Sequence, residues 1–103
     1  MKAGVGAITS RFVKGSTGGP SAEERRQGSS HIVAMAFDAG GRCLSEVRVE
    51  GANGYDFTGG MLAWGAMRAA DGGLRGAGAL GPVDGFGLDE LEAGAAEAGI
   101  ARV

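Results

Sequence analysis

Residues 30–51 carry the clearest alternation of side-chain character in the chain. The first segment is apolar on both faces, with His31, Val33, Met35 and Phe37 on one and Ile32, Ala34 and Ala36 on the other. Such two-sided apolarity predicts an inner strand rather than an exposed edge. The return segment places Cys43, Ser45, Val47 and Val49 on one face and Leu44, Glu46, Arg48 and Glu50 on the other. With the Asp-Ala-Gly-Gly turn of residues 38–41 between them, these segments predict a β-hairpin whose charged face is in water.

The next segment has helical periodicity and is apolar almost all the way round. Thr58 is predicted to cap a helix that runs to about Asp71 and ends at the following glycines. One stripe holds Leu62, Gly65, Ala66 and Ala69 with Met61 beside it, and Trp64 and Met67 lie nearly opposite. A hairpin can cover only one side of such a helix, so the sequence predicts a partner surface for the other side.

The C-terminal third is predicted to be a glycine-rich loop followed by a second helix. Residues 72–87 contain seven glycines and are expected to be loop. The helix is predicted from about Gly87 to Ala98, because Leu88, Leu91 and Ala95 fall on one stripe. Acidic residues in its first turn also suit the positive end of the helix dipole. Gly99 followed by Ile100 fits a left-handed C-cap with its hydrophobic contact.

Residues 1–29 are predicted to be a linker with one short helical turn. Ser21 can cap a turn over residues 22–26, Glu24 can close a capping box with it, and Gly28 ends the turn. We therefore expect a linker over residues 1–29 and an α+β domain over residues 30–103. The domain should contain an antiparallel β-hairpin, as part of a mixed sheet, packed with two helices.

Composition narrows the possible functions. A chain of 103 residues accommodates one small domain. Glycine supplies 22 residues, about three times its usual share of about 7%, and with 6% aromatic residues we expect marginal stability in isolation. The net charge is −2 and the N-terminal basic residues are scattered, so nucleic-acid binding is not expected. No apolar run is long enough to span a membrane, and a single Cys43 fits a reducing, cytoplasmic setting.

Several residues invite a chemical interpretation but lack partners. Gly4-Val5-Gly6 resembles the start of a dinucleotide fingerprint without its strand and third glycine, and Lys14-Gly15-Ser16 lacks the upstream glycine of a P-loop. His31 has no acidic or nucleophilic residue at a diagnostic spacing, and Cys43 has no second cysteine. The acidic cluster comprises Asp84, Asp89, Glu90 and Glu92, which we expect to be a solvated helix terminus. We expect no cofactor-binding or metal-ligating residue in this chain.

Tyr55 and Asp56 are the remaining candidates for catalysis. Tyr55 could donate a proton, and Asp56 could orient it or contact a substrate. In the structural alternative, Tyr55 and Phe57 pack beneath the helix while Asp56 and Thr58 satisfy its first N–H groups. We favour the structural alternative, and therefore assign no catalytic residue.

Four short segments, taken in order, resemble the C-terminal region of saccharopine dehydrogenase-like oxidoreductases. They are residues 19–25 (GPSAEER), 38–42 (DAGGR), 54–58 (GYDFT) and 78–82 (GALGP), and the likeness covers roughly residues 15–100. The resemblance implies an N-terminal Rossmann domain that binds NAD(P), followed by an α+β domain whose mixed sheet helps form the substrate cleft and often a subunit contact. This sequence has no counterpart of the Rossmann domain.

We therefore expect this chain to be the C-terminal α+β portion of such an oxidoreductase, cut from a longer protein and inactive alone. The partner would be the missing Rossmann domain. The alternative is a stand-alone, non-enzymatic module that dimerises through Trp64, Met67 and the hairpin. A third hypothesis is a small enzyme that uses Tyr55 and Asp56.

Overall fold

The computed structural model describes residues 17–103, which form a three-stranded antiparallel sheet and four helices. The elements are α2 (Ala22–Gln27), β1 (Ser29–Phe37), β2 (Cys43–Ala52), α3 (Gly54–Ala70), α4 (Pro82–Phe86), α5 (Leu88–Glu97) and β3 (Ile100–Arg102). This is the α+β architecture that the sequence predicts. Gly4–Gly6, Lys14–Ser16 and most of the expected linker lie outside the described residues.

The hairpin forms where the alternation places it. β1 and β2 are antiparallel, with Val33 opposite Arg48. At the turn, Asp38 Oδ1 accepts from the backbone N–H groups of Gly40 and Arg42, and Gly41 takes a positive φ of 86°. Glu46, Arg48 and Glu50 are exposed whereas Val47 and Val49 are half-buried, as expected.

The prediction that residues 30–37 form an inner strand is wrong. The strand order is β1-β2-β3, so β1 lies at an edge and β2 is central. β3 pairs only with residues 49–51 of β2, and its Ile100 is opposite Gly51. The three strands are all antiparallel rather than mixed. β3 is not predicted from the sequence, because a three-residue strand is too short to show a period.

The helix after the hairpin begins earlier than predicted. α3 starts at Gly54, and its N-cap is Asn53 rather than Thr58. The Thr58 hydroxyl instead donates to the carbonyl oxygen of Gly54 at 2.7 Å, one helical turn back. Asp71 is the C-cap, in agreement with the predicted end.

The segment predicted to be loop contains the short helix α4. Pro82 stands at its first position, where the missing N–H costs nothing, and Gly81 is the N-cap. α5 matches its predicted bounds, and Gly99 takes the expected left-handed conformation with a φ of 105°. Ile100, predicted as the hydrophobic contact of that cap, is buried and continues into β3.

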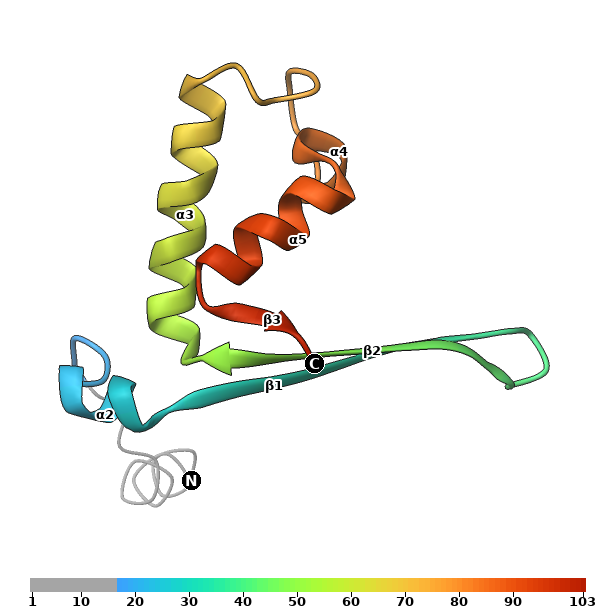
Figure 1. Ribbon diagram of the computed structural model, residues 1–103, viewed down its shortest axis with the longest axis horizontal. Helices are drawn as coiled ribbons and strands as arrows, with labels where there is room; N and C mark the ends of the chain where they lie inside the picture. The colour runs from blue at the N-terminus through green and yellow to red at the C-terminus, as the bar shows by residue number, and fades with distance from the viewer. Residues whose placement is uncertain (1–16) are drawn as a thin grey trace, which may run out of the picture.

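The arrangement of these elements leaves the domain open (Figure 1). α3 rises from one end of the sheet, α5 runs back beside it above β3, and the hairpin extends well beyond both helices. The radius of gyration is 18.8 Å, against about 13 Å for a compact domain of 100 residues. Ile100, at 4% exposure, is the one buried hydrophobic residue of the described chain. None of the described helices is long and apolar enough to cross a bilayer.

Before β1, α2 is closed by the predicted capping box. The Ser21 hydroxyl accepts from Glu24 N at 3.3 Å, and the Glu24 carboxylate accepts from Ser21 N at 2.7 Å. The backbone and hydroxyl hydrogen bonds with Ser21 hold the pKa of Glu24 below its ordinary value of 4.5. The box therefore contributes its stability above the ordinary pKa and loses it as the pH falls through the lowered one.

We expect acidification below the ordinary pKa of Glu24 to break this box. The Ser21 amide resonance, followed by NMR from neutral pH into acid, should show a titration with a midpoint below the ordinary glutamate value. Glu24→Gln keeps an acceptor oxygen but cannot titrate, so the transition should disappear in that variant. The same Ser21 transition in Glu24→Gln would assign the effect to another group, such as Glu23, which pairs with Arg26 and Gln27.

Candidate functional site

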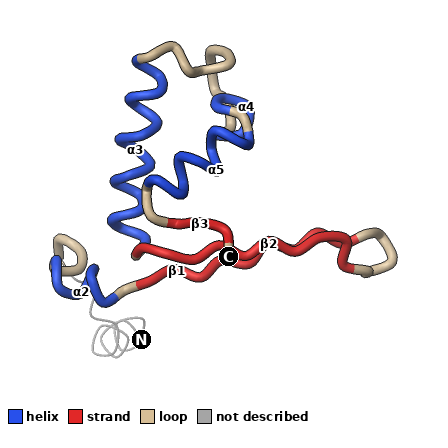
Figure 2. Tube along the Cα trace, in the orientation of Figure 1, coloured by secondary structure: helices blue, strands red, loops and turns tan. Residues whose placement is uncertain are grey.

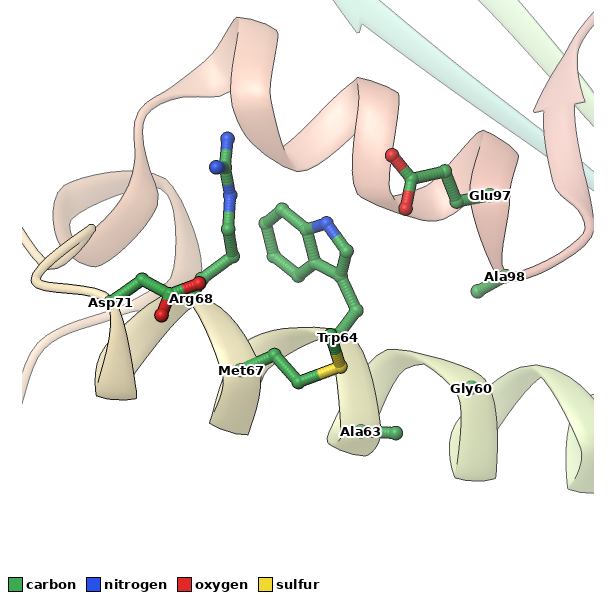
Figure 3. Close-up of a pocket in the computed structure, with 8 residues that line it drawn as sticks. All are labelled: Gly60, Ala63, Trp64, Met67, Arg68, Asp71, Glu97 and Ala98. Atoms are coloured by element: carbon green, nitrogen blue, oxygen red, sulfur yellow. The ribbon is translucent and has the colours of Figure 1, made fainter.

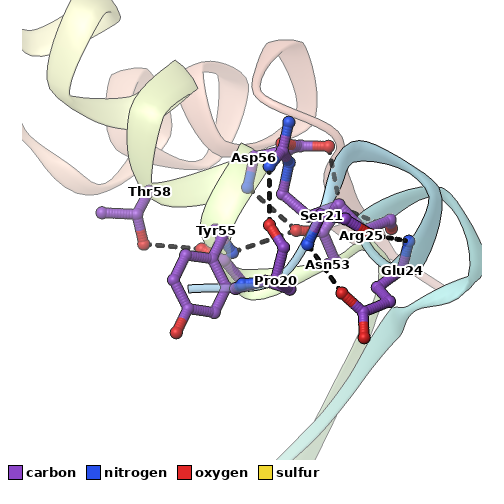
Figure 4. Close-up of polar contacts among 9 residues, drawn as sticks. Pro20, Ser21, Glu24, Arg25, Asn53, Tyr55, Asp56 and Thr58 are labelled. Carbon is purple, nitrogen blue, oxygen red and sulfur yellow. Dashed lines mark hydrogen bonds and ion pairs between the residues drawn. The ribbon is translucent and has the colours of Figure 1, made fainter. Parts of the chain in front are cut away.

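Polar side chains from two distant segments meet at the N-terminus of α3 (Figure 4). Asn53 Oδ1 accepts from Tyr55 N at 3.1 Å and from Asp56 N at 3.0 Å. Its Nδ2 donates to the carbonyl oxygen of Arg25 and to Asp56 Oδ2, both at 2.8 Å. Arg25 Nε lies 3.0 Å from Asp56 Oδ1. We call Arg25, Asn53 and Asp56 the Asn53 junction, since the asparagine joins α2 to α3.

The junction decides where Tyr55 and Asp56 lie. Both Asp56 oxygens are engaged, one by Arg25 and one by Asn53, which suits anchoring rather than proton transfer. The prediction that Asp56 satisfies the first N–H groups of the helix is wrong, because Asn53 Oδ1 accepts from them instead. Tyr55 is 64% exposed and lies against the backbone of Gly19 instead of beneath the helix, which corrects that part of the structural alternative. Phe57 is half-buried and lines an apolar cavity, as that alternative expects.

Sequence reasoning missed Asn53 as a cap, although a signal was present. Asn53 and Asp56 have the N-cap and N3 spacing of a capping box, and asparagine is among the preferred N-cap residues. Arg25 could not have been paired with them, because it lies 28 residues before Asn53.

Replacing Asn53 with alanine should lower the free energy of unfolding by about 1–2 kcal/mol. The change removes the acceptor for two N–H groups of α3 and the donor that reaches α2. Asn53→Ser is the matched control, because its neutral hydroxyl keeps an acceptor at the N-cap and loses the Nδ2 donors. Urea unfolding should place Asn53→Ser between the parent chain and Asn53→Ala. Equal stability of the parent and Asn53→Ala would contradict the role of the junction.

The other candidate residues are dispersed over the surface. His31 Nδ1 lies 3.2 Å from Glu50 Oε1 on the exposed face of the hairpin, and Cys43 is an exposed free thiol. Of the acidic cluster, Glu90 pairs with Arg68 and Glu92 pairs with Arg102, so its members face different elements. Among residues 17–103, no group of three metal-ligating side chains comes together.

Trp64 holds α3 and α5 together. Its ring lies on Gly94 of α5 and 4.9 Å from the ring of Phe86, centroid to centroid. The Arg68 guanidinium lies 5.8 Å from the centroid of the indole, which adds a cation–π contact. Arg68 also pairs with Glu90 of α5. Trp64 thus faces α5, whereas Met67 is 67% exposed.

Beside Trp64 is a cavity of about 450 Å³ (Figure 3). Its polar side chains are Arg68, Asp71 and Glu97. Its lining contains no serine, cysteine, histidine, lysine or tyrosine, so the carboxylates of Asp71 and Glu97 are its only side chains that could act as a base or nucleophile. The cavity can contact polar groups, but its residues do not form a recognisable catalytic set.

Two further cavities are mainly apolar. One, of about 430 Å³, lies among α3, α4 and α5, and its lining includes Met61, Leu62 and Phe86. The other, of about 400 Å³, lies between the sheet and the helices and is lined by Val47, Val49 and neighbours. Phe57 and Leu91 line both, so the apolar surface continues from the helices to the inner face of the sheet.

The best-developed feature of the described chain is therefore this apolar surface, and its polar residues act mainly in joining elements. Comparison with known proteins adds no assignment, because no family model, curated protein or solved structure matches this sequence.

Proposed function

We propose that this chain is a non-catalytic α+β domain of the saccharopine dehydrogenase-like kind, which packs its apolar faces on a nucleotide-binding domain. The observation that carries the proposal is the near absence of a core in residues 17–103. The exposed large hydrophobic residues are Ile32, Val33, Met35, Phe37, Leu44, Tyr55, Leu62, Met67, Leu74, Leu80, Val83, Leu88 and Val103. Apolar surface this extensive marks an interaction site, because monomeric soluble proteins rarely expose it.

The positions of the family-like segments support the proposal. The first caps α2, the second forms the hairpin turn, the third opens α3 and the fourth leads into α4. The first and third also touch, since Arg25 pairs with Asp56. Residues that carry the resemblance thus serve the architecture of this domain, which is what a domain without its own chemistry requires.

In this proposal the two parts of the protein have separate tasks. NAD(P) binding and hydride transfer belong to the nucleotide-binding domain, in the cytoplasm. This chain covers that domain with the apolar surface around Phe57 and Leu91, and buries its own cavities in return.

The second candidate is a dimerisation module that uses Trp64, Met67 and the hairpin. The exposure of Met67 favours it, because an unbranched thioether fits adaptable interfaces. Trp64 contributes less, since its ring already packs on Gly94 and Phe86.

Reading the DNA directly upstream of the Met1 codon tests the proposal. We expect an in-frame segment that encodes a strand, a GxGxxG turn and a helix, or a neighbouring gene that encodes such a domain. The joined protein should then bind NAD(P)H, measured by quenching of the dinucleotide fluorescence, while residues 17–103 alone should not. An upstream stop codon and promoter, with no such gene nearby, would count decisively against it.

A further inference from the structure

We propose that β1 pairs antiparallel with β1 of a second copy of this chain, which joins two hairpins across a two-fold axis. Among the described residues, β2 is the only strand that pairs with β1, so one side of this nine-residue strand is open. An open edge is a template for another strand, and its outward backbone groups need hydrogen-bond partners.

The hydrogen bonds of β3 fix which backbone groups face each side. Ala52 N donates to the carbonyl oxygen of Gly99, and Val103 N donates to that of Arg48. Even-numbered residues of β2 therefore turn their backbone groups toward β3. Because these groups alternate along an antiparallel strand, odd-numbered residues of β2 turn theirs toward β1.

The register then identifies the groups at the open edge. Val49 of β2 is opposite Ile32, so the even-numbered residues of β1 bond to β2. The N–H and C=O groups of His31, Val33 and Met35 consequently point away from the sheet. They form an uninterrupted row of donors and acceptors that a neighbouring strand can use.

Over residues 29–36, β1 has none of the features that usually protect an edge. It contains no proline, no lysine, arginine or carboxylate, and its only titratable residue is His31. Val33 is 53% exposed, and the apolar side chains on both faces are similarly open. The only irregularity is a register shift at its far end, between Ala36 and Phe37. Natural proteins place charges, proline or bulges along strands that must stay unpaired.

The hairpin also requires more strands than one copy provides (Figure 2). β3 covers only residues 49–51 of β2, and beyond them the hairpin is a two-stranded arm that extends away from the helices. A two-stranded hairpin is marginally stable in water, whereas three or more strands with an apolar face are stable. Two arms joined through β1 make four strands, two from each copy.

β1 is complementary to itself, which identifies the second copy as the occupant. A two-fold axis at Val33 pairs all nine residues, with Val33 opposite its equivalent and Ile32 opposite Ala34. On the face that carries Val33, the charged residues of β2 are Glu46, Arg48 and Glu50, and they stand one strand further from the axis. No charge meets a like charge across the axis, so the pairing meets no electrostatic penalty.

This interface is separate from the proposed function. A nucleotide-binding domain would cover the helices and the inner face of the sheet, whereas the second copy takes the backbone edge of β1. Either can therefore be lost while the other is kept.

Sedimentation of the full chain over a concentration series tests the pairing. We expect a reversible dimer. Val33→Glu places two carboxylates opposite each other at the axis and should raise the dimer dissociation constant by about tenfold or more. Within its own hairpin the new carboxylate faces Arg48, so far-UV circular dichroism should retain the sheet.

Leu44→Glu is the matched control, because Leu44 is 57% exposed and lies on β2 of the same arm, away from the open edge of β1. It should leave the dissociation constant unchanged. Val33→Cys, in a Cys43→Ser background, should form a covalent dimer on oxidation, since residues opposite at a two-fold axis are within disulfide reach. A chain that stays monomeric, or a dimer that Leu44→Glu disrupts and Val33→Glu does not, would overturn the proposal. A monomer would mean that another segment covers the open edge of β1. A dimer disrupted only by Leu44→Glu would mean that the interface lies on the other side of the arm.

Discussion

Replacing Gly51 with alanine should detach β3 from the sheet and lower the free energy of unfolding by about 3 kcal/mol or more. A Cβ atom on Gly51 would overlap the carbonyl oxygen of Gly99 and lie 2.9 Å from Ile100 Cα. Both obstacles are backbone atoms, so relief requires the two strands to separate. Separation exposes Ile100, the buried hydrophobic residue of this region.

Urea unfolding and hydrogen exchange measure the two parts of this effect. The Ala52 amide donates to Gly99 at 2.9 Å, so its exchange should accelerate in Gly51→Ala more than that of hairpin amides. Gly41→Ala is the control, because Gly41 has a positive φ of 86° with open space around its Cα. In that variant the free energy of unfolding should fall only by the cost of the left-handed backbone conformation, about 1–2 kcal/mol. Equal losses in both would exclude the collision as the cause.

The elements that the sequence predicts well are those fixed by neighbouring residues. The Ser21 capping box, the turn at Asp38 and Gly41, and the Gly99 C-cap all depend on side chains within four positions. At such short spacings the sequence shows both the interacting residue and its partner, and local backbone geometry fixes the distance between them. The same holds for α5, whose periodic apolar positions and flanking glycines gave its bounds.

The incorrect predictions share a dependence on distant residues. β1 has apolar residues on both faces, a pattern of inner strands, yet its second neighbour is missing within the described chain. Apolar residues on both faces fit a strand with two neighbouring strands, and the described part of one copy gives β1 only one, β2. β3 pairs with β2 at Gly51, which lies about 50 residues before Ile100 in the sequence. No local sequence pattern predicts that pairing.

For the candidate functional residues too, local roles could be predicted and long-range contacts could not. That Asp56 has a structural role was predictable from its place at the helix N-terminus, but its partner Arg25 was not. The helical wheel places Trp64 nearly opposite Leu62, yet only the fold reveals that its ring packs on Gly94 of α5. The contact of Trp64 with Gly94 could not be predicted, because glycine has no side chain whose character would indicate a partner.

Replacing Gly94 with alanine should therefore lower the free energy of unfolding by about 2–3 kcal/mol, because the added methyl overpacks the helix contact. Its Cβ would overlap Cε2 of Trp64 and lie 2.6 Å from Cδ2. The indole lies between Gly94 and Phe86, so it can yield only if it turns toward the neighbouring cavity or if α3 and α5 move apart. This loss would override the gain of about 1 kcal/mol that alanine normally brings over glycine in a helix. Trp64 fluorescence should shift to the red as its ring becomes wetter.

Gly59→Ala separates helix propensity from packing. Gly59 lies within α3 with open space where a Cβ would be, so its replacement should stabilise the chain by about 0.5–1 kcal/mol. Trp64→Leu should relieve the collision, and the double variant with Gly94→Ala should be more stable than the two single losses added together. Additive losses would mean that the two residues do not meet. Coupled losses would show that the small interhelix contact at Gly94 holds the two longer helices at the spacing on which the apolar cavities depend.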